Sequence, residues 1–186
     1  MTYEWDVFIS YRRETAVHAW THRVFLPALR EWLPHFGGAP ARVFVDQDSV
    51  PAGTAWPAEI EAALLRSRCA VAILSPDYFH SAWCLAEFHT LLRRQQLTGM
   101  PAIVPLRFSD GDHFDDEARA LEWIDVEPFN WMRSRSRSGT RTFTQSVKGV
   151  CERVAQLVRD APAWDPDWTV VRPTRPAASA FAKPEF

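Results

Sequence analysis

The sequence has 186 residues, which is enough for one domain of ordinary size. Hydrophobic residues make up 47% of the chain and charged residues 24%, proportions that exclude disorder as the dominant state. The formal net charge of -2 excludes a whole-molecule field that would attract nucleic acid or an anionic membrane surface. We therefore expect any ligand to be recognised by a local site.

The cysteines and the apolar runs indicate the compartment. Cys69, Cys84 and Cys151 are odd in number and lie in apolar stretches, so we expect reduced thiols in the core. No apolar stretch reaches the roughly 20 residues that cross a bilayer. Glu4 and Asp6 interrupt the first apolar run, which is untypical of an export signal. We expect a cytoplasmic location and no membrane partner.

Short apolar runs alternate with longer segments of helical period, and this order predicts an α/β fold with a parallel sheet between helices. In chain order, the strands are predicted at residues 5–11, 42–45, 69–74, 102–106 and 123–126. The helices are predicted at residues 16–35, from Trp56-Pro57 onward, at 77–96 and at 143–159. Ser75-Pro76 is predicted to cap the helix at 77–96.

The composition changes to proline, alanine and tryptophan without period from Pro162 onward. This change predicts a domain at residues 1–160 and a C-terminal tail or linker at residues 161–186. Two roles are open for the tail. It either packs Trp164 and Trp168 on the domain or tethers another part of the protein.

Three segments share a distinctive pattern at the ends of predicted strands. The first, Asp6 to Arg13, places Ser-Tyr-Arg-Arg at the end of a strand. The second runs from Val43 through a loop that begins at Asp46 and continues past Val50-Pro51-Ala52-Gly53 to Ile60. The third is Leu74-Ser-Pro-Asp-Tyr78 followed by Ser81-Ala-Trp-Cys-Leu-Ala-Glu87. In this order they resemble the sequence boxes of TIR (Toll/interleukin-1 receptor) domains, and Phe129-Asn130-Trp131 is similar to a loose closing box.

The resemblance covers about residues 3–160 and implies a flavodoxin-like three-layer sandwich with a five-stranded parallel sheet. Independently, open sheets of this type bind ligands beyond the carboxyl ends of their strands. Each box includes the residues that follow such a strand end. The expected pocket and the family boxes therefore coincide.

The third segment resembles the NAD-cleaving branch of the family, of a prokaryotic defence type, and this implies that Glu87 is catalytic. The resemblance and the strand ends together assign substrate binding to Ser10, Tyr11, Arg12, Arg13, Asp46 and Trp83. Nicotinamide leaves NAD as a neutral molecule, so one carboxylate beside the oxocarbenium-like ribose suffices. The resemblance implies NAD as the substrate, and neither a metal nor a separate cofactor is expected.

Other interpretations of these residues remain open. In the alternative interpretation, Glu87 is a solvated helix carboxylate and Trp83 is a packing residue. Arg12 and Arg13 then face solvent, and Ser10 and Tyr11 only close the strand. His18 and His22 stand four apart on a predicted helix, but without a third ligand a packing role is favoured over a metal site. The Arg-Ser run at residues 133–138 is interpreted as a solvated loop, with no nucleic-acid partner.

Two functions follow from different classes of protein. One is an NAD glycohydrolase or cyclase in anti-phage or stress signalling, activated by self-association through TIR–TIR contacts and by a tethered or separate sensor. The other is a non-catalytic TIR scaffold that signals by assembly alone. The carboxylate at Glu87 favours the enzyme, because a scaffold does not need it.

Overall fold

The computed structural model describes residues 2–13, 16–45, 58–109, 111–112, 114, 116–126 and 137–172, of which 137–142 by backbone alone. The strands are β1 (Trp5–Tyr11), β2 (Val43–Val45), β3 (Ser67–Leu74), β4 (Ile103–Arg107) and β5 (Ile124–Asp125). The helical elements are α1 (Ala16–Trp20), the π-helical turn η1 (Thr21–Phe25), α2 (Leu26–Gly37), α3 (Ala58–Leu65), α4 (Pro76–Phe79), α5 (Ala82–Thr98), α6 (Asp116–Arg119) and α7 (Arg137–Asp160).

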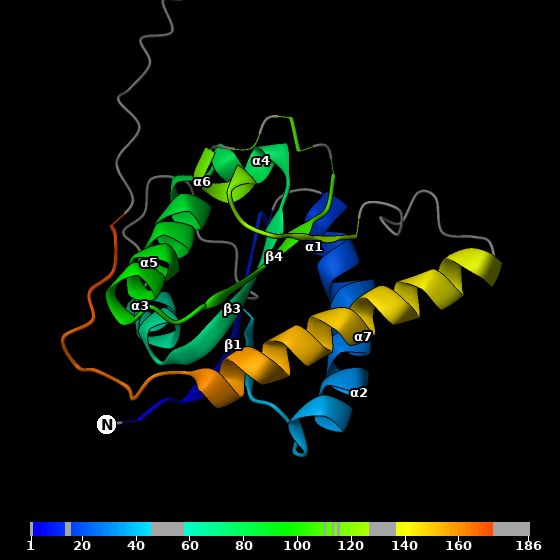
Figure 1. The fold of residues 1–186 in the computed structure, drawn as a ribbon. Coiled ribbons are helices and arrows are strands. Elements are labelled where there is room, and N and C mark those ends of the chain that lie inside the picture. The colour runs from blue at the N-terminus through cyan, green and yellow to red at the C-terminus, as the bar shows by residue number, and fades with distance from the viewer. Residues whose placement is uncertain are drawn as a thin grey trace, which may run out of the picture.

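The five strands form one parallel sheet in the order β2-β1-β3-β4-β5 (Figure 1). The central strand, β3, is an almost continuous apolar run that is buried along nearly its whole length, as expected where helices cover both faces. The register pairs Ser10 of β1 with Ala72 of β3, near the carboxyl ends of both strands. The predicted α/β fold with a five-stranded parallel sheet is confirmed.

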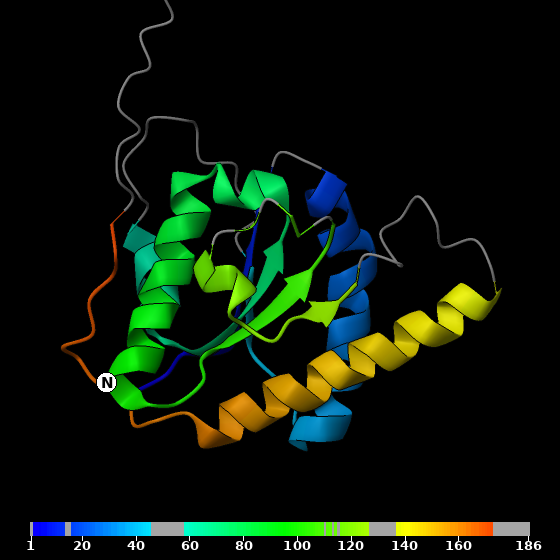
Figure 2. The same cartoon turned by 45° about the horizontal axis from the view of Figure 1, so that its top comes forward.

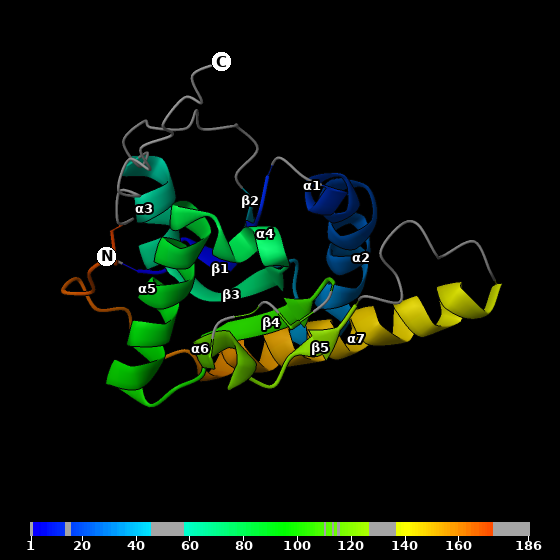
Figure 3. The same cartoon turned by 90° about the horizontal axis from the view of Figure 1, so that it is seen from above.

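Helices cover both faces of the sheet and form the two outer layers (Figure 3). The helices α1, η1, α2 and α7 pack against one face, where Val7 and Ile9 of β1 are buried. The helices α3, α4, α5 and α6 pack against the other face, where Phe8 is buried. Because side chains alternate along a strand, consecutive residues of β1 belong to different cores. Figure 2 shows the strands between the two helical layers, and α7 runs across the sheet within one of these layers.

The helix predicted at residues 77–96 is in fact two helices, and this prediction was wrong. α4 ends at Phe79, and α5 begins after Ser81, which has extended backbone angles (φ -100°, ψ 111°). The Ser81 hydroxyl accepts a hydrogen bond from the Cys84 backbone N–H at 3.3 Å. Ser75 does precede α4 with an extended backbone, but its side chain makes no cap bond. A serine cap at Ser81 therefore restarts the helix after one short turn.

The first predicted helix is continuous in space but contains the π-helical turn η1. The residues that flank the turn, Trp20 and Leu26, keep right-handed helical angles, so the chain passes through without a break. A π-turn holds one more residue than an α-turn and therefore shifts the buried face of the following helix. α7 begins at Arg137, six residues before the predicted Phe143.

Both edges of the sheet are short. β2 has three residues and β5 has two. Pro105 lies inside β4, where it aligns with Ala72 of β3, and β5 pairs only with the residues that follow this proline. Because proline lacks an N–H, it cannot donate to a neighbouring strand.

After α7 ends at Asp160, residues 161–172 form no helix or strand and run back beside α3 and α5 (Figure 1). The Trp164 indole N–H donates to the Leu65 carbonyl at 3.3 Å. The Val171 N–H donates to the Thr90 hydroxyl at 2.8 Å. The described part of the tail therefore packs on the domain, which is the first of the two roles considered for it.

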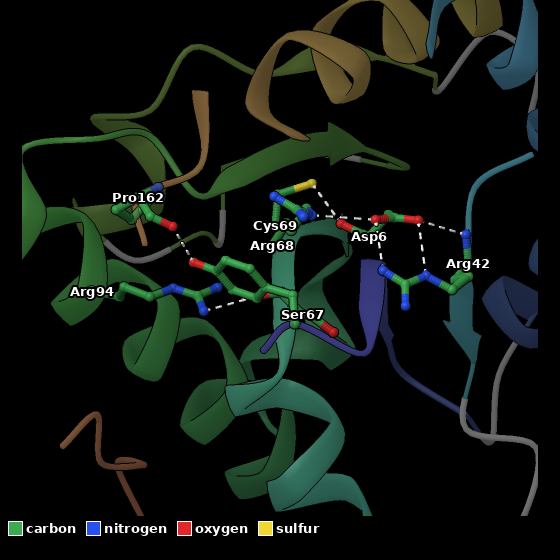
Figure 4. A network of polar contacts seen from close by, with 8 residues as sticks. Asp6, Arg42, Ser67, Arg68, Cys69, Arg94 and Pro162 are labelled. Atoms are coloured by element: carbon green, nitrogen blue, oxygen red, sulfur yellow. Dashed lines mark hydrogen bonds and ion pairs between the residues drawn. The ribbon is translucent and has the colours of Figure 1, made fainter. Parts of the chain in front are cut away.

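Asp6 forms an ion cluster at the amino ends of three strands (Figure 4). Its carboxylate accepts the Arg42 N–H at 2.9 Å and lies 3.3 Å from the guanidinium groups of both Arg42 and Arg68. Burial alone would raise the pKa of Asp6, but the Arg42 hydrogen bonds and the two positive charges outweigh it and lower the pKa below its ordinary value.

This lowered pKa predicts a specific acid sensitivity. The carboxylate stabilises the fold above the unfolded-state pKa of about 3.9, and that contribution is lost as the pH falls through the lower folded-state pKa. In Asp6→Asn this part of the pH dependence is expected to be absent, as measured by urea unfolding between about pH 2 and pH 6. The exposed Glu152→Gln on α7 is the control. An unchanged acid slope in Asp6→Asn contradicts the assignment.

Two glycines allow a matched stability test. Gly99 ends α5 with φ +67°, whereas Gly149 lies inside α7, and an added Cβ at either position meets no atom within 4 Å. Gly99→Ala is expected to lower the free energy of unfolding by about 1–2 kcal/mol, because alanine must adopt the left-handed backbone conformation there and no steric clash adds to this cost. Gly149→Ala is expected to raise it by about 0.5–1 kcal/mol. Urea denaturation measures both, and equal effects would contradict the backbone explanation.

Candidate functional site

The candidate site lies at the carboxyl ends of β1 and β3, next to α4 and α5. Ser10 is the penultimate residue of β1 and faces the same layer as Phe8, because the two are one strand period apart. Glu87 is on α5, and Tyr78 is on α4. Three elements therefore contribute one polar side chain each to the same point.

These three side chains form a hydrogen-bonded chain. The Ser10 hydroxyl donates to Glu87 Oε2 at 2.6 Å and lies 2.7 Å from the Tyr78 hydroxyl. Since the Ser10 proton is used toward the carboxylate, the Tyr78 hydroxyl is the donor to Ser10 Oγ. Both distances are those of well-formed O–H···O hydrogen bonds. Tyr78 and Ser10 thus fix the position of the Glu87 carboxylate.

Glu87 is buried because it lies on the side of α5 that packs against the sheet. Cys84, Phe88 and Leu91 lie on the face of this helix that packs on the sheet, and Glu87 lies on the same side with 4% of its surface exposed. A carboxylate at this depth is uncommon and requires hydrogen bonds. The alternative of a solvated helix carboxylate therefore does not describe Glu87.

Arg12 and Arg13 follow β1 and are half-buried. Burial and the neighbouring Glu87 raise the pKa of the Cys84 thiol to about 12, while the positive charges of Arg12 and Arg13 act in the opposite direction. Both side chains are therefore within electrostatic reach of Cys84, which precedes Glu87 by three residues. The site therefore has a buried carboxylate and two half-buried arginines that follow the strand carrying Ser10.

Tyr11 is not brought together with Glu87. It is buried on the opposite face of the sheet, and its hydroxyl lies 2.7 Å from His22 Nε2 and 3.5 Å from His18 Nδ1. Burial, together with the charges of His18 and Arg30, lowers the pKa of His22. Within the described ranges, no group of three or more His, Cys, Asp or Glu side chains could hold a metal ion.

The remaining predicted residues are placed in part. Trp83 is half-buried on the first turn of α5, one turn before Glu87. Asp46 and the loop through residue 57 lie outside the described residues, as does the Phe129-Asn130-Trp131 segment. Their predicted roles stay predictions.

The sequence interpretation missed Tyr78 as a site residue. The residue is fully buried, and its hydroxyl supports Ser10. Ser75 is also buried, and its hydroxyl has no hydrogen-bond partner in the described part of the chain. Both residues lie in the third box, so their position after β3 was the available signal.

A family model described as "TIR domain" matches residues 7–137, which is more than half of the chain. The chain belongs to the TIR domain family. This membership confirms the family named from the three boxes. No curated protein sequence matches this TIR domain. None of the helices in the described ranges combines the length and the apolar composition of a transmembrane span.

Two solved structures are similar to this TIR domain. One is the TIR domain of the Toll-related receptor TRR-2 from the lower metazoan Hydra magnipapillata, at 19% identity over 77% of this chain and 98% of that chain, with a TM-score of 0.49. The other is the TIR domains of the activated Roq1 resistosome, which directly recognises the pathogen effector XopQ. It is 23% identical over 82% of this chain and 84% of that chain, with a TM-score of 0.43.

The hydrogen-bonded chain makes a prediction about stability. Ser10→Ala removes a donor from a buried carboxylate and is expected to lower the free energy of unfolding by about 1–3 kcal/mol. Tyr78→Phe removes only the bond to Ser10 and is expected to cost about 0.5–1.5 kcal/mol.

The control is Ser10→Ala in a Glu87→Gln background, where the acceptor carries no charge. There the serine substitution is expected to cost less, as measured by urea denaturation in a double-mutant cycle. Equal costs in both backgrounds would show that the serine does not act through the carboxylate.

Proposed function

We propose that this TIR domain cleaves the bond between nicotinamide and ribose in NAD, with Glu87 as the catalytic carboxylate. The supporting observation is the buried position of Glu87 at the carboxyl edge of the sheet, held by the hydroxyl of Ser10. Ligands bind at this edge in open α/β sheets. A scaffold that signals by assembly alone has no use for a carboxylate held in this way.

The reaction requires little from the protein beyond this carboxylate. The C1′–N bond breaks, its electron pair stays on the ring nitrogen, and neutral nicotinamide leaves without needing a proton. Positive charge grows on the ribose, and the negative charge of Glu87 stabilises it. Water then adds to C1′ and loses a proton, giving ADP-ribose, or a nucleophile within the same molecule adds instead and gives a cyclic product.

The two arginines after β1 fit the rest of the substrate. Arg12 and Arg13 follow the strand that carries Ser10, and guanidinium groups bind phosphate oxygens through paired N–H donors. They would hold the pyrophosphate, while half-buried Trp83 would offer an aromatic surface to the nicotinamide or the ribose. The Asp46 loop would complete the pocket, and a second copy of the domain would contribute to it through TIR–TIR contacts.

The direct test replaces the charge and keeps the shape. Glu87→Gln can still accept the hydrogen bond from Ser10, but it cannot stabilise a cation. Its rate of nicotinamide release from NAD is expected to fall by about 10²–10³-fold, with folding unchanged by circular dichroism. Chromatography of the products separates ADP-ribose from a cyclic isomer.

Glu152→Gln on the exposed surface of α7 is the matched control and is expected to keep full activity.

Because we propose activation by self-association, the rate per molecule is expected to rise with protein concentration. Full turnover by Glu87→Gln would exclude the catalytic role. A chain that releases no nicotinamide at any concentration, yet forms oligomers, would favour the scaffold.

A further inference from the structure

Tyr11, His18 and His22 bring three metal-binding atoms together on the face of the sheet opposite Glu87. Tyr11 ends β1, His18 lies in α1, and His22 lies in the π-helical turn η1. The Tyr11 hydroxyl lies 2.7 Å from His22 Nε2 and 3.5 Å from His18 Nδ1. The centroids of the two imidazole rings are 4.5 Å apart. The proposed cleavage of NAD uses neither histidine.

The helix places both histidines on one side. His18 and His22 are four residues apart, so their side chains lie one turn apart on the same face. The π-helical turn begins at Thr21, between them, and such turns are frequent at functional sites. The sequence offered no third ligand near this pair, and Tyr11 is the ligand that the fold adds.

The separations between these atoms suit a tetrahedral metal ion. Bonds from zinc to nitrogen or oxygen are about 2.0–2.2 Å long, so two ligand atoms of a tetrahedral zinc ion lie about 3.3–3.5 Å apart. The distance from the Tyr11 hydroxyl to His18 Nδ1 is already of this size. The distance from the hydroxyl to His22 Nε2 is shorter, because a proton lies between these two atoms. A small rotation of the half-buried imidazole of His22 makes up the difference.

His22 is in the form that binds metal ions. Burial, together with the charges of His18 and Arg30, lowers the pKa of His22, so its ring is neutral at neutral pH. With its own proton on Nδ1, the ring accepts the Tyr11 proton at Nε2, and the lone pair of Nε2 then points at the phenol oxygen. Both imidazoles are only half-buried, so an ion can reach them from solvent.

We propose that Tyr11, His18 and His22 bind a zinc ion, with the fourth position of the metal left to water. The ion takes the place of the proton between Tyr11 and His22. The phenol O–H bond breaks and the proton passes to the buffer, while the phenolate oxygen and the two imidazole nitrogens each donate an electron pair to the metal. Imidazole is a preferred ligand of zinc, and three protein ligands with one water is a common arrangement. The ion ties the end of β1 to α1 and η1.

The experiment is a calorimetric titration of the full, untagged chain with zinc chloride, after a chelator has removed bound metal. One ion per chain is expected to bind, with a dissociation constant below about 100 µM. A tyrosinate difference spectrum in the near ultraviolet is expected to grow with the same midpoint, because coordination removes the phenol proton.

Three substitutions test the ligands one at a time. Tyr11→Phe is expected to abolish the tyrosinate spectrum. This variant, His18→Gln and His22→Gln are each expected to weaken zinc binding at least about tenfold, since even the loss of a hydrogen bond to a metal ligand costs about 10–100-fold in affinity. His35→Gln replaces an exposed histidine of α2 and is the control, expected to change nothing. Circular dichroism of the metal-free variants establishes whether they are folded.

Arg30 keeps the test independent of folding. It is exposed, and its positive charge acts on His22, where it opposes a bound cation. Arg30→Gln is expected to tighten zinc binding by about two- to fivefold, the size of an exposed charge interaction. Arg153→Gln, on the exposed surface of α7, removes the same charge elsewhere and is expected to leave the affinity unchanged.

The proposal is overturned by a dissociation constant above about 100 µM or by a titration without one-to-one saturation. It is also overturned if Tyr11→Phe binds zinc as tightly as the unchanged chain, or if Arg30→Gln has the same affinity as Arg153→Gln. None of these measurements involves the cleavage of NAD.

Discussion

The hydrogen bond between Ser10 and Glu87 is the contact on which the candidate site depends. It joins the end of β1 to the second turn of α5 and gives a buried carboxylate oxygen a hydrogen-bond donor. The contact requires that Ser10 points to the face of the sheet on which α5 packs. It also requires that α5 begins directly after Ser81, so that Glu87 lies opposite Ser10. The fold and the proposed chemistry are therefore linked through this hydrogen bond.

The alternation of apolar runs was enough to predict the sheet, because strands covered on both faces must be apolar throughout. The candidate site was predictable only in part. Ser10 and Glu87 were identified from their boxes, although neither box indicates that their side chains touch. Strand alternation does place Ser10 and Tyr11 on opposite faces, yet both were among the six residues to which substrate binding was assigned.

The features that were missed depend on contacts between distant segments. The helix break before α5 depends on one residue, Ser81. The apolar periodicity of the sequence continues across this break and therefore does not reveal it. In the sequence, Tyr78 has the pattern of an ordinary core aromatic residue. Only the contact of its hydroxyl with Ser10 in the structure shows that it belongs to the site. Arg94 of α5 is buried by partners far from it in the sequence, which include the Ser67 carbonyl and the Trp168 ring of the returning tail. Local spacing carries no information about such partners.

The short strands at the two borders of the sheet limit how copies of this protein can meet. β2 and β5 offer few open backbone groups, and Pro105 removes a donor next to the shorter of them. Such borders are poor templates for intermolecular strand addition. Helix surfaces and loops are then better suited than the sheet edges to contacts between copies, and such contacts leave the sheet of each copy unchanged.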